Sequence, residues 1–498
     1  MKRLCVSLAA LVATSAAFAA DLPTKKAPVV PEKPNCFASL YSYFDSTPAD
    51  CPLTYWGLTF YATVDMGVGY QTHGTPFNRN YPTGVEELIS KNSNRGQWLL
   101  TPGGISQSQV GVKIKEPLFG GLSFVGEVAT GFDPYSLRLA DGPRSMANNT
   151  AIPLQFQSSN GDSSRAGQWD NSVGYAGFSQ EQFGTLTFGR QNTLSLDGIN
   201  AYDPMGGSYA FSPIGYSGRA AGDGNTETAR SNTALKYAGK FGNFRVNGLL
   251  QIGGYNLGNA SNGMYQVGVG ADFYGVSLDA IYTNVKDQVA LATYNGIAGG
   301  PGQPAGYGLV GLPAGVPSNA LKATLSNNND LMILGKYKWN QFTLFGGFEY
   351  IRYSNPTDAY PNGFKSIGGF PVLPGAVTSN NYNIPLNFDI LWTGVKYAIN
   401  DRLDVTGAYY LYIQNNFEPN AANCGPNTTV VTGYNLKGTA SGKCQGYLNA
   451  FSAMLDYRPL KRVDLYAGFM YSTVSGGLAS GFLNSSNFDP TIGVRVRF

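Results

Sequence analysis

The feature that most constrains this chain is a repeated segment of about ten residues in which apolar and polar side chains alternate. In residues 58–67, every second residue from Leu58 to Met66 is apolar, and the residues between them include Thr59 and Asp65. Alternation with a period of two indicates a β-strand with one apolar face, and this segment length is typical of transmembrane β-strands. Sixteen such segments are predicted, over residues 54–70, 106–115, 122–132, 171–179, 184–191, 231–239, 244–252, 264–273, 276–285, 330–338, 342–353, 387–397, 403–414, 445–457, 463–474 and 488–498.

The composition excludes several other classes of protein. Only 13% of the residues are charged, about half the usual share of ~25% in soluble globular domains. A further 13% are aromatic, which argues against disorder. Helical membrane spans need about 20 consecutive apolar residues, and the sequence after its N-terminus has no such run. A soluble sheet would carry more Lys and Glu on its exposed face. Apolar residues that occur at every second position, and not in long runs, therefore favour a membrane protein made of β-strands.

The lengths of the connections alternate along the chain. Short connections such as 116–121 and 274–275 follow the even-numbered segments, and long ones such as 71–105 and 192–230 mostly follow the odd-numbered segments. This alternation is typical of short periplasmic turns and long outer loops. A sheet in hydrocarbon must close on itself to pair its backbone. The sequence therefore predicts an all-β, transmembrane, 16-stranded antiparallel barrel, which is wide enough for an aqueous channel.

The N-terminus has the three parts of a secretory signal peptide. A positively charged start is followed by an apolar stretch over 4–18 and a small-residue cleavage site that ends at Ala19. We expect three regions: a signal peptide over 1–19, a Pro/Lys-rich N-terminal extension over 20–52, and a barrel domain over 53–498. Export to the cell outer membrane follows from these regions.

Four cysteines remain after cleavage: Cys36, Cys51, Cys424 and Cys444. An even number of cysteines in an exported chain suggests disulfides. The local pairs Cys36–Cys51 and Cys424–Cys444 are the simplest of three connectivities, and free thiols are the alternative.

The sequence offers little for catalysis or for cofactors. His73 is the only histidine, no serine sits in a nucleophile elbow, and no phosphate loop or zinc motif occurs. The run from Asn327 to Asp330 has oxygen ligands suited to a hard cation, although a polar loop is the simpler interpretation. Loss of Lys2 and Arg3 lowers the net charge from +3 to about +1, which gives no electrostatic footprint for nucleic acid. We expect no enzyme activity, no cofactor and no metal.

Several segments resemble strands of the Gram-negative general porins. Residues 57–65 resemble the first strand of that family, and 175–191 resemble its fourth and fifth strands, which is the most specific match. Residues 491–498 resemble the last strand, whose C-terminal Phe498 would be read by the barrel-assembly machinery. The lead around 50–53 is similar to porins of alphaproteobacteria. The resemblance implies a homotrimer in contact with outer-membrane lipid and lipopolysaccharide.

The resemblance also implies that the third long loop, 192–229, folds into the barrel and narrows the pore. Its acidic residues would face basic residues on the barrel wall, and such charges set selectivity in a pore. Gln109 stands where the family often has a wall arginine. The expected constriction acids are Asp197, Asp203, Asp223 and Glu227, and the expected wall basics are Lys113, Lys115, Lys236 and Arg245 by strand alternation, Arg190 by its motif, and Arg230 at the end of the loop. Alternation also directs Arg495 and Arg497 to the lumen.

Passive diffusion of ions and small hydrophilic solutes is the function that these expectations favour. One alternative is a substrate-specific channel for sugars, dicarboxylates or phosphate. Aromatic residues along the lumen would favour sugars, and alternation directs Tyr410, Tyr412 and Tyr466 there, whereas a ladder of arginines would favour anions. Another is an adhesin or structural barrel that acts through its long loops and has a closed lumen.

Overall fold

The computed structural model describes residues 35–73, 96–135, 137, 171–214, 230–293, 321–357, 366–367, 370–379, 382–419, 443–479 and 484–498. The signal peptide, the first part of the N-terminal extension, Asp223, Glu227 and Cys424 lie outside these residues. Among the described residues, no helix is both long enough and apolar enough to cross a membrane.

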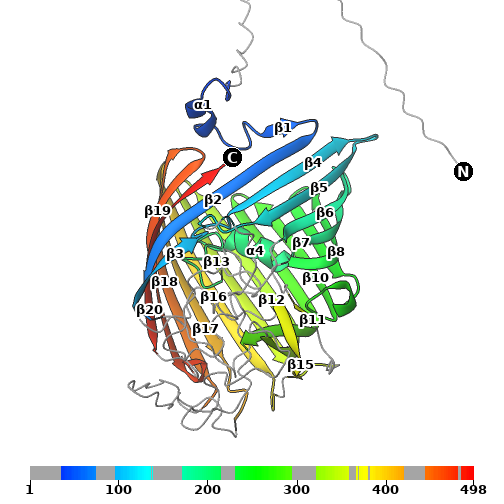
Figure 1. Cartoon of the computed structure of the whole chain (residues 1–498), viewed down its shortest axis with the longest axis vertical. Coiled ribbons are helices and arrows are strands. Elements are labelled where there is room, and N and C mark those ends of the chain that lie inside the picture. The colour runs from blue at the N-terminus through cyan, green and yellow to red at the C-terminus, as the bar shows by residue number, and fades with distance from the viewer. Residues whose placement is uncertain are drawn as a thin grey trace, which may run out of the picture.

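The described strands form one closed, antiparallel barrel of sixteen strands (Figure 1). Closure is made where the first strand pairs with the last, with Thr63 opposite Arg497 and Gly69 opposite Thr491. The barrel strands are β2 (Leu58–Gln71), β3 with β4 (Gln97–Pro102 and Gln109–Pro117), β5 (Leu122–Gly131), β6 (Asn171–Gln180), β7 (Gly184–Asn192), β8 (Arg230–Phe241), β9 (Phe244–Gln251), β10 (Gly263–Phe273), β11 (Val276–Thr293), β12 (Leu321–Trp339), β13 (Phe342–Ser354), β16 (Leu386–Asn400), β17 (Leu403–Gln414), β18 (Gly446–Leu460), β19 (Val463–Gly476) and β20 (Ser486–Arg497). The predicted fold class is confirmed, and each of the sixteen predicted segments overlaps one barrel strand.

Some elements differ from the prediction. The second barrel strand is interrupted, because β3 and β4 both pair with β2 but are separated by residues 103–108. Two strands, β11 and β12, continue beyond the predicted 276–285 and 330–338. The predicted segment 54–70 is divided into β1 (Leu53–Tyr55) and β2, which pair with each other. Short elements outside the prediction are β14 (Ser366–Ile367), β15 (Phe370–Ser379) and the 3-10 helices η3 (Tyr255–Leu257) and η4 (Gly477–Ala479).

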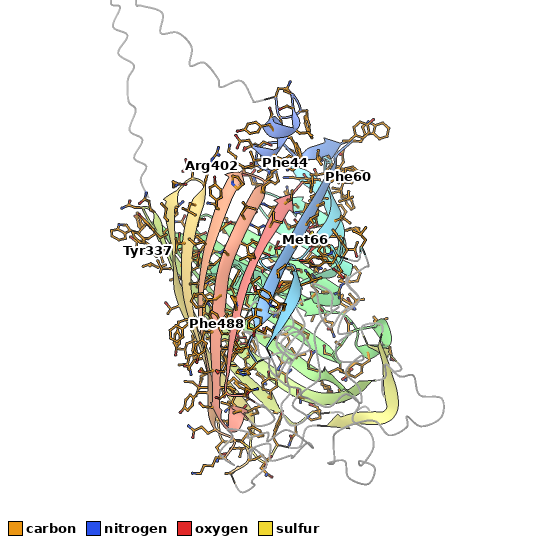
Figure 2. The ribbon with its side chains drawn as sticks, turned by 60° about the vertical axis from the view of Figure 1, so that its left-hand side comes forward. Phe44, Phe60, Met66, Tyr337, Arg402 and Phe488 are labelled. Carbon is orange, nitrogen blue, oxygen red and sulfur yellow. A yellow bond between two sulfur atoms is a disulfide. The ribbon has the colours of Figure 1, made fainter. Side chains whose placement is uncertain are left out.

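The outer surface of the barrel is apolar because of the strand alternation. Phe60 and Phe488 are exposed there, and Figure 2 shows them with Met66 and Tyr337 along the outside of the wall. In a membrane this surface contacts lipid. The polar residues between them, such as Thr59 and Thr63, share the opposite face with Asp65, as the sequence predicts.

The two sides of the barrel have different heights. Strands β4 to β9 contain 8 to 12 residues each and form what we term the low wall. Strands β11 to β13 and β16 to β19 contain 12 to 19 residues each and form the tall wall. The short turns gather at one end of the barrel, together with the C-terminus and α1 (Leu40–Phe44) (Figure 1). We term this the short-turn end.

A helix from the third long connection lies inside the barrel (Figure 1). This helix, α4 (Leu194–Tyr202), starts at Thr193, whose hydroxyl accepts a hydrogen bond from the Leu196 amide and caps the helix. Its apolar side packs against the tall wall, where a Cβ added to Gly198 would lie 2.7 Å from Cδ1 of Leu334. Residues up to Ile214 continue along the inside of the wall, and Ile214 is fully buried.

The N-terminal extension is tied to the short-turn end. A disulfide joins Cys36 to Cys51, and the loop between them surrounds Arg462, which is fully buried. The ring of Phe44 packs edge-on against that of Phe498, with 5.7 Å between the centroids. Cys444 is also disulfide-bonded. The extension therefore contacts the turn before β19 and the C-terminal residue of the barrel.

Candidate pore constriction

Helix α4 and the lumen face of the low wall enclose a cavity of about 760 Å³. Strand alternation directs the polar residues of β4 to β8 into this space. The third long connection, which contains α4, supplies the residues on the opposite side of the cavity. The charged residues of its lining are Lys113, Lys115, Glu127, Asp197, Arg230 and Lys236, and other polar residues of the lining include Tyr61, Gln109, Tyr175, Asn200 and Tyr209. Five of the predicted site residues therefore meet in one cavity, with Glu127 as an additional acid.

Asp197 reaches across from the first turn of α4 to the low wall. Its Oδ2 lies 2.5 Å from Nζ of Lys236 on β8. Lys236 also donates to the carbonyl oxygen of Asn192 at 2.9 Å, and Nδ2 of Asn192 donates to Oδ1 of Asp197 at 3.2 Å. The pair links the start of the loop to the wall, while the Asp197 side chain remains 46% exposed to the cavity.

Glu127 on β5 is held by three neighbours: Tyr61 on β2, Lys113 on β4 and Tyr175 on β6. Its carboxylate accepts hydrogen bonds from the hydroxyls of Tyr61 at 2.5 Å and Tyr175 at 2.9 Å. Nζ of Lys113 lies 3.7 Å from the same carboxylate and 5.0 Å from the centre of the Tyr61 ring. Sequence reasoning missed Glu127, although strand alternation directs it inward in the same way as Lys113.

The charges of the described lining are unequal. Four cations, Lys113, Lys115, Arg230 and Lys236, stand against the two carboxylates of Glu127 and Asp197. Lys115 is exposed, and no carboxylate of the described residues lies within 4.0 Å of its amine. The lining that the structure describes has a formal excess of two positive charges.

Asp203 does not face the cavity, which corrects the expectation for this residue. It is buried, its Oδ1 accepts a hydrogen bond from the Tyr410 hydroxyl at 2.6 Å, and its Oδ2 accepts one from the Gly207 amide at 2.8 Å. Burial raises the pKa of Asp203 above its usual value. Asp203 therefore fastens the loop to β17.

Tyr466 also contacts the loop from the wall. Its hydroxyl lies 2.7 Å from Oδ1 of Asp65, and its ring packs against Phe211.

Arg245 faces the lumen but lies outside the cavity. Its guanidinium bonds to Asp272 and lies 3.2 Å from Oδ2 of Asp279, and it donates to the hydroxyl of Tyr202 at 3.1 Å. Two carboxylates neutralise this arginine, so its contact with Tyr202 at the end of α4 is structural.

Arg190 lies on the outer face of the barrel, contrary to the expectation from its motif. It pairs with Gly174, the residue between Val173 and Tyr175, which both line the cavity. The register between β7 and β8 shifts after Gly189, whose φ of +136° favours glycine. Nη1 of Arg190 donates to Oδ1 of Asn232 at 2.7 Å. The similarity of the motif correctly placed Arg190 along the strand, but it did not show whether the side chain faces the lumen or the outside of the barrel.

Three arginines at the short-turn end of the lumen are paired with acids. Arg495 lies 2.9 Å and Arg497 lies 3.2 Å from Oδ2 of Asp464. Arg458 lies 2.8 Å from both Asp404 and Asp456. These groups form a network along β17 to β20 and are not part of the cavity lining.

Comparisons with known proteins agree with this architecture. A family model described as Gram-negative porin matches residues 7–477. No curated protein matches the sequence. A solved structure of an anion-selective porin from Comamonas acidovorans is similar, with a TM-score of 0.53 and 13% identity over 89% of this chain and 99% of that chain. Outer-membrane expressed OmpT of Vibrio cholerae is also similar, with a TM-score of 0.51 and 12% identity over 90% of this chain and 100% of that chain.

The family match covers almost the whole sequence, and the two structures share the fold. A closed barrel with an apolar outer surface, an inward helix and a charged cavity agrees with that match. The chain belongs to the Gram-negative porin family, and it forms a non-enzymatic channel of the outer membrane.

Proposed function

We propose that this porin is a passive diffusion channel for ions and small hydrophilic solutes with a weak preference for anions. The observation that carries the preference is the excess of cations in the described lining, where Lys113, Lys115, Arg230 and Lys236 outnumber Glu127 and Asp197. The preference is weak because both carboxylates are held close to lysines of the same lining, so opposite charges partly cancel. The similar Comamonas acidovorans structure is described as anion-selective, which agrees with this sign.

A channel that selects sugars has less support. The tyrosines that alternation directs inward on the tall wall are buried: Tyr410 is 0% exposed, Tyr466 is 2% exposed and Tyr412 is 3% exposed. Rings in such positions offer no face for stacking on a sugar. Channels for dicarboxylates or phosphate remain compatible with a cationic lining, and they differ from a general porin by a saturable conductance.

We propose the following orientation and assembly. The short-turn end faces the periplasm, as in other outer-membrane barrels. The signal peptide over 1–19 is removed on export, Phe498 is read by the barrel-assembly machinery, and the barrel contacts lipid and lipopolysaccharide. The chain is a homotrimer of the alphaproteobacterial type. These proposals rest on the sequence resemblance and on the apolar outer surface.

Reversal potentials in a planar bilayer test the function. Refolded protein is placed under a tenfold KCl gradient, with current measured as a function of voltage. The expected result is stable openings in steps of three, conductance linear with salt, and a reversal potential on the anion side of zero. A reversal potential on the cation side would contradict the preference. Folded barrels without conductance would contradict the channel itself.

A further inference from the structure

Three lysines lie together inside the tall wall at the short-turn end, outside the constriction. Lys336 and Lys338 are on β12, and Lys396 is on β16. Their neighbours Tyr337, Trp339 and Val395 are exposed on the outer surface, and Figure 2 shows Tyr337 on the outside of the wall. Strand alternation therefore directs the three amines to the lumen.

The strand register brings these lysines close to each other. Lys338 is opposite Thr343 on β13, and Thr343 is opposite Lys396. Two strand spacings separate the backbones of Lys338 and Lys396, which is about 10 Å. Lys336 is two residues from Lys338, or about 7 Å along the strand. Flexible lysine side chains can reach a common point across these distances, with the Thr343 hydroxyl between them.

No carboxylate of the described residues lies within 4.0 Å of any of the three amines. Lys336 donates to the carbonyl oxygen of Ala201 at 3.2 Å, and its amine lies 5.1 Å from the centre of the Tyr202 ring. Lys338 is exposed, and Lys396 is half-buried. The arginines at the same end differ in this respect, because Arg458 is paired with acids, as are Arg495 and Arg497. The lysine group thus supplies three positive charges that no described carboxylate compensates within 4.0 Å.

We propose that Lys336, Lys338 and Lys396 form a binding station for a small divalent anion at the periplasmic mouth of the channel. The proposal rests on the proposed function, since an anion reaches this station through the constriction. Two ammonium groups that lie two strand spacings apart match a ligand with two negative charges, such as a phosphate or a short dicarboxylate, better than a monovalent ion. Ammonium groups are hydrated point charges on flexible stems, so the station holds the anion briefly and releases it.

Block of chloride current by inorganic phosphate tests the station. Single channels are recorded in 0.1 M KCl at pH 7 while sodium phosphate is added to both sides, and sodium succinate is tested separately. We expect a saturable, partial block by both divalent anions and none by sodium acetate at the same ionic strength. K338Q/K396Q should raise the half-blocking concentration about tenfold, because the anion loses two exposed ion pairs. K338R/K396R keeps the charges and should keep the block.

K461Q is the matched control, because Lys461 is exposed in the turn between β18 and β19 at the same end of the barrel. The half-blocking concentration of K461Q should equal that of the wild type. The single variants K338Q and K396Q, which remove the same charge, should each raise it. An equal block in K338Q/K396Q and the wild type would overturn the station, as would a conducting wild-type channel without saturable block. A folded wild type with no conductance would instead contradict the proposed function. Block by phosphate but not succinate would restrict the ligand to a compact oxyanion.

Discussion

Two aspartates of the same loop have different roles: one lines the cavity and the other is buried against the wall. Asp197 and Asp203 are six residues apart, and the sequence gives no reason to treat them differently. Asp197 projects from the first turn of α4 to Lys236 across the cavity. Asp203 follows the helix and is buried against Tyr410. Only the path of the loop along the wall decides which carboxylate meets the solute.

D197N and D203N should therefore have different effects on ion selectivity. D197N removes an exposed acid and frees Lys236 from its ion pair, so the reversal potential should move toward anions by several millivolts under a tenfold KCl gradient. D203N removes a buried group whose pKa is raised by burial, and its reversal potential should match that of the wild type. Equal shifts in the two variants would mean that Asp203 also faces the channel.

Arg462 is the residue on which the N-terminal extension depends. Its guanidinium donates to the carbonyl oxygens of Tyr43 at 3.0 Å and Cys51 at 2.5 Å, and it lies 4.1 Å from the centre of the Tyr43 ring. R462M should destabilise the attachment by about 3 kcal/mol, because it leaves buried carbonyl groups without donors. Limited proteolysis of residues 35–52 measures the effect.

R402M is the control for that variant. Arg402 is exposed and lies 3.7 Å from Asp45, and it is near the same extension in Figure 2. An exposed pair of this kind contributes less than about 1 kcal/mol, so cleavage should hardly change. Cleavage of R462M at the wild-type rate would show that the disulfide alone holds the extension in place.

At the scale of elements, strand alternation predicts where the strands lie and which side chains face the lumen, because both depend on residues that are close in sequence. It found all sixteen barrel strands, and it directed Lys113, Lys115 and Lys236 to the lumen, where the structure has them. It did not find the interruption between β3 and β4, a local departure from regular pairing that depends on which strand lies alongside. Arg190 was placed by its motif, whereas alternation alone puts it on the outer face with Leu186 and Phe188.

Helix α4 lies close to the wall at Gly198, and this contact sets the width of the cavity. A Cβ at this position would be 2.7 Å from Leu334 and 3.0 Å from Ile281. G198V should push the helix away from the tall wall and toward the low wall, lowering single-channel conductance by roughly half while the barrel stays folded. V128A, which changes an exposed outward residue of the low wall, is the control and should conduct as the wild type. Unchanged conductance in G198V would indicate that α4 does not limit the flow.

At the scale of the whole molecule, the channel is displaced to one side of the barrel. The lumen face of the tall wall carries apolar residues such as Met332, Ile351 and Phe388, which are 0% exposed. Space for solutes remains between the loop and the low wall. The sequence predicted a wide barrel and an inward loop, but not the wall against which the loop packs. That choice depends on contacts between residues more than 100 positions apart, such as the hydrogen bond that Nε1 of Trp392 donates to the carbonyl oxygen of Tyr202 at 3.2 Å.

The central claim is that solutes pass between α4 and the low wall. Its most direct test is chemical modification of N200C, because Asn200 is an exposed residue of α4 that lines the cavity. Single-channel current is recorded while a bulky, charged thiol reagent is added, with V128C on the outer surface as the control. The account predicts that modification of N200C removes most of the current in each pore and that V128C is unaffected. Full current through channels with modified N200C would contradict it, because the path of the ions would then avoid this cavity.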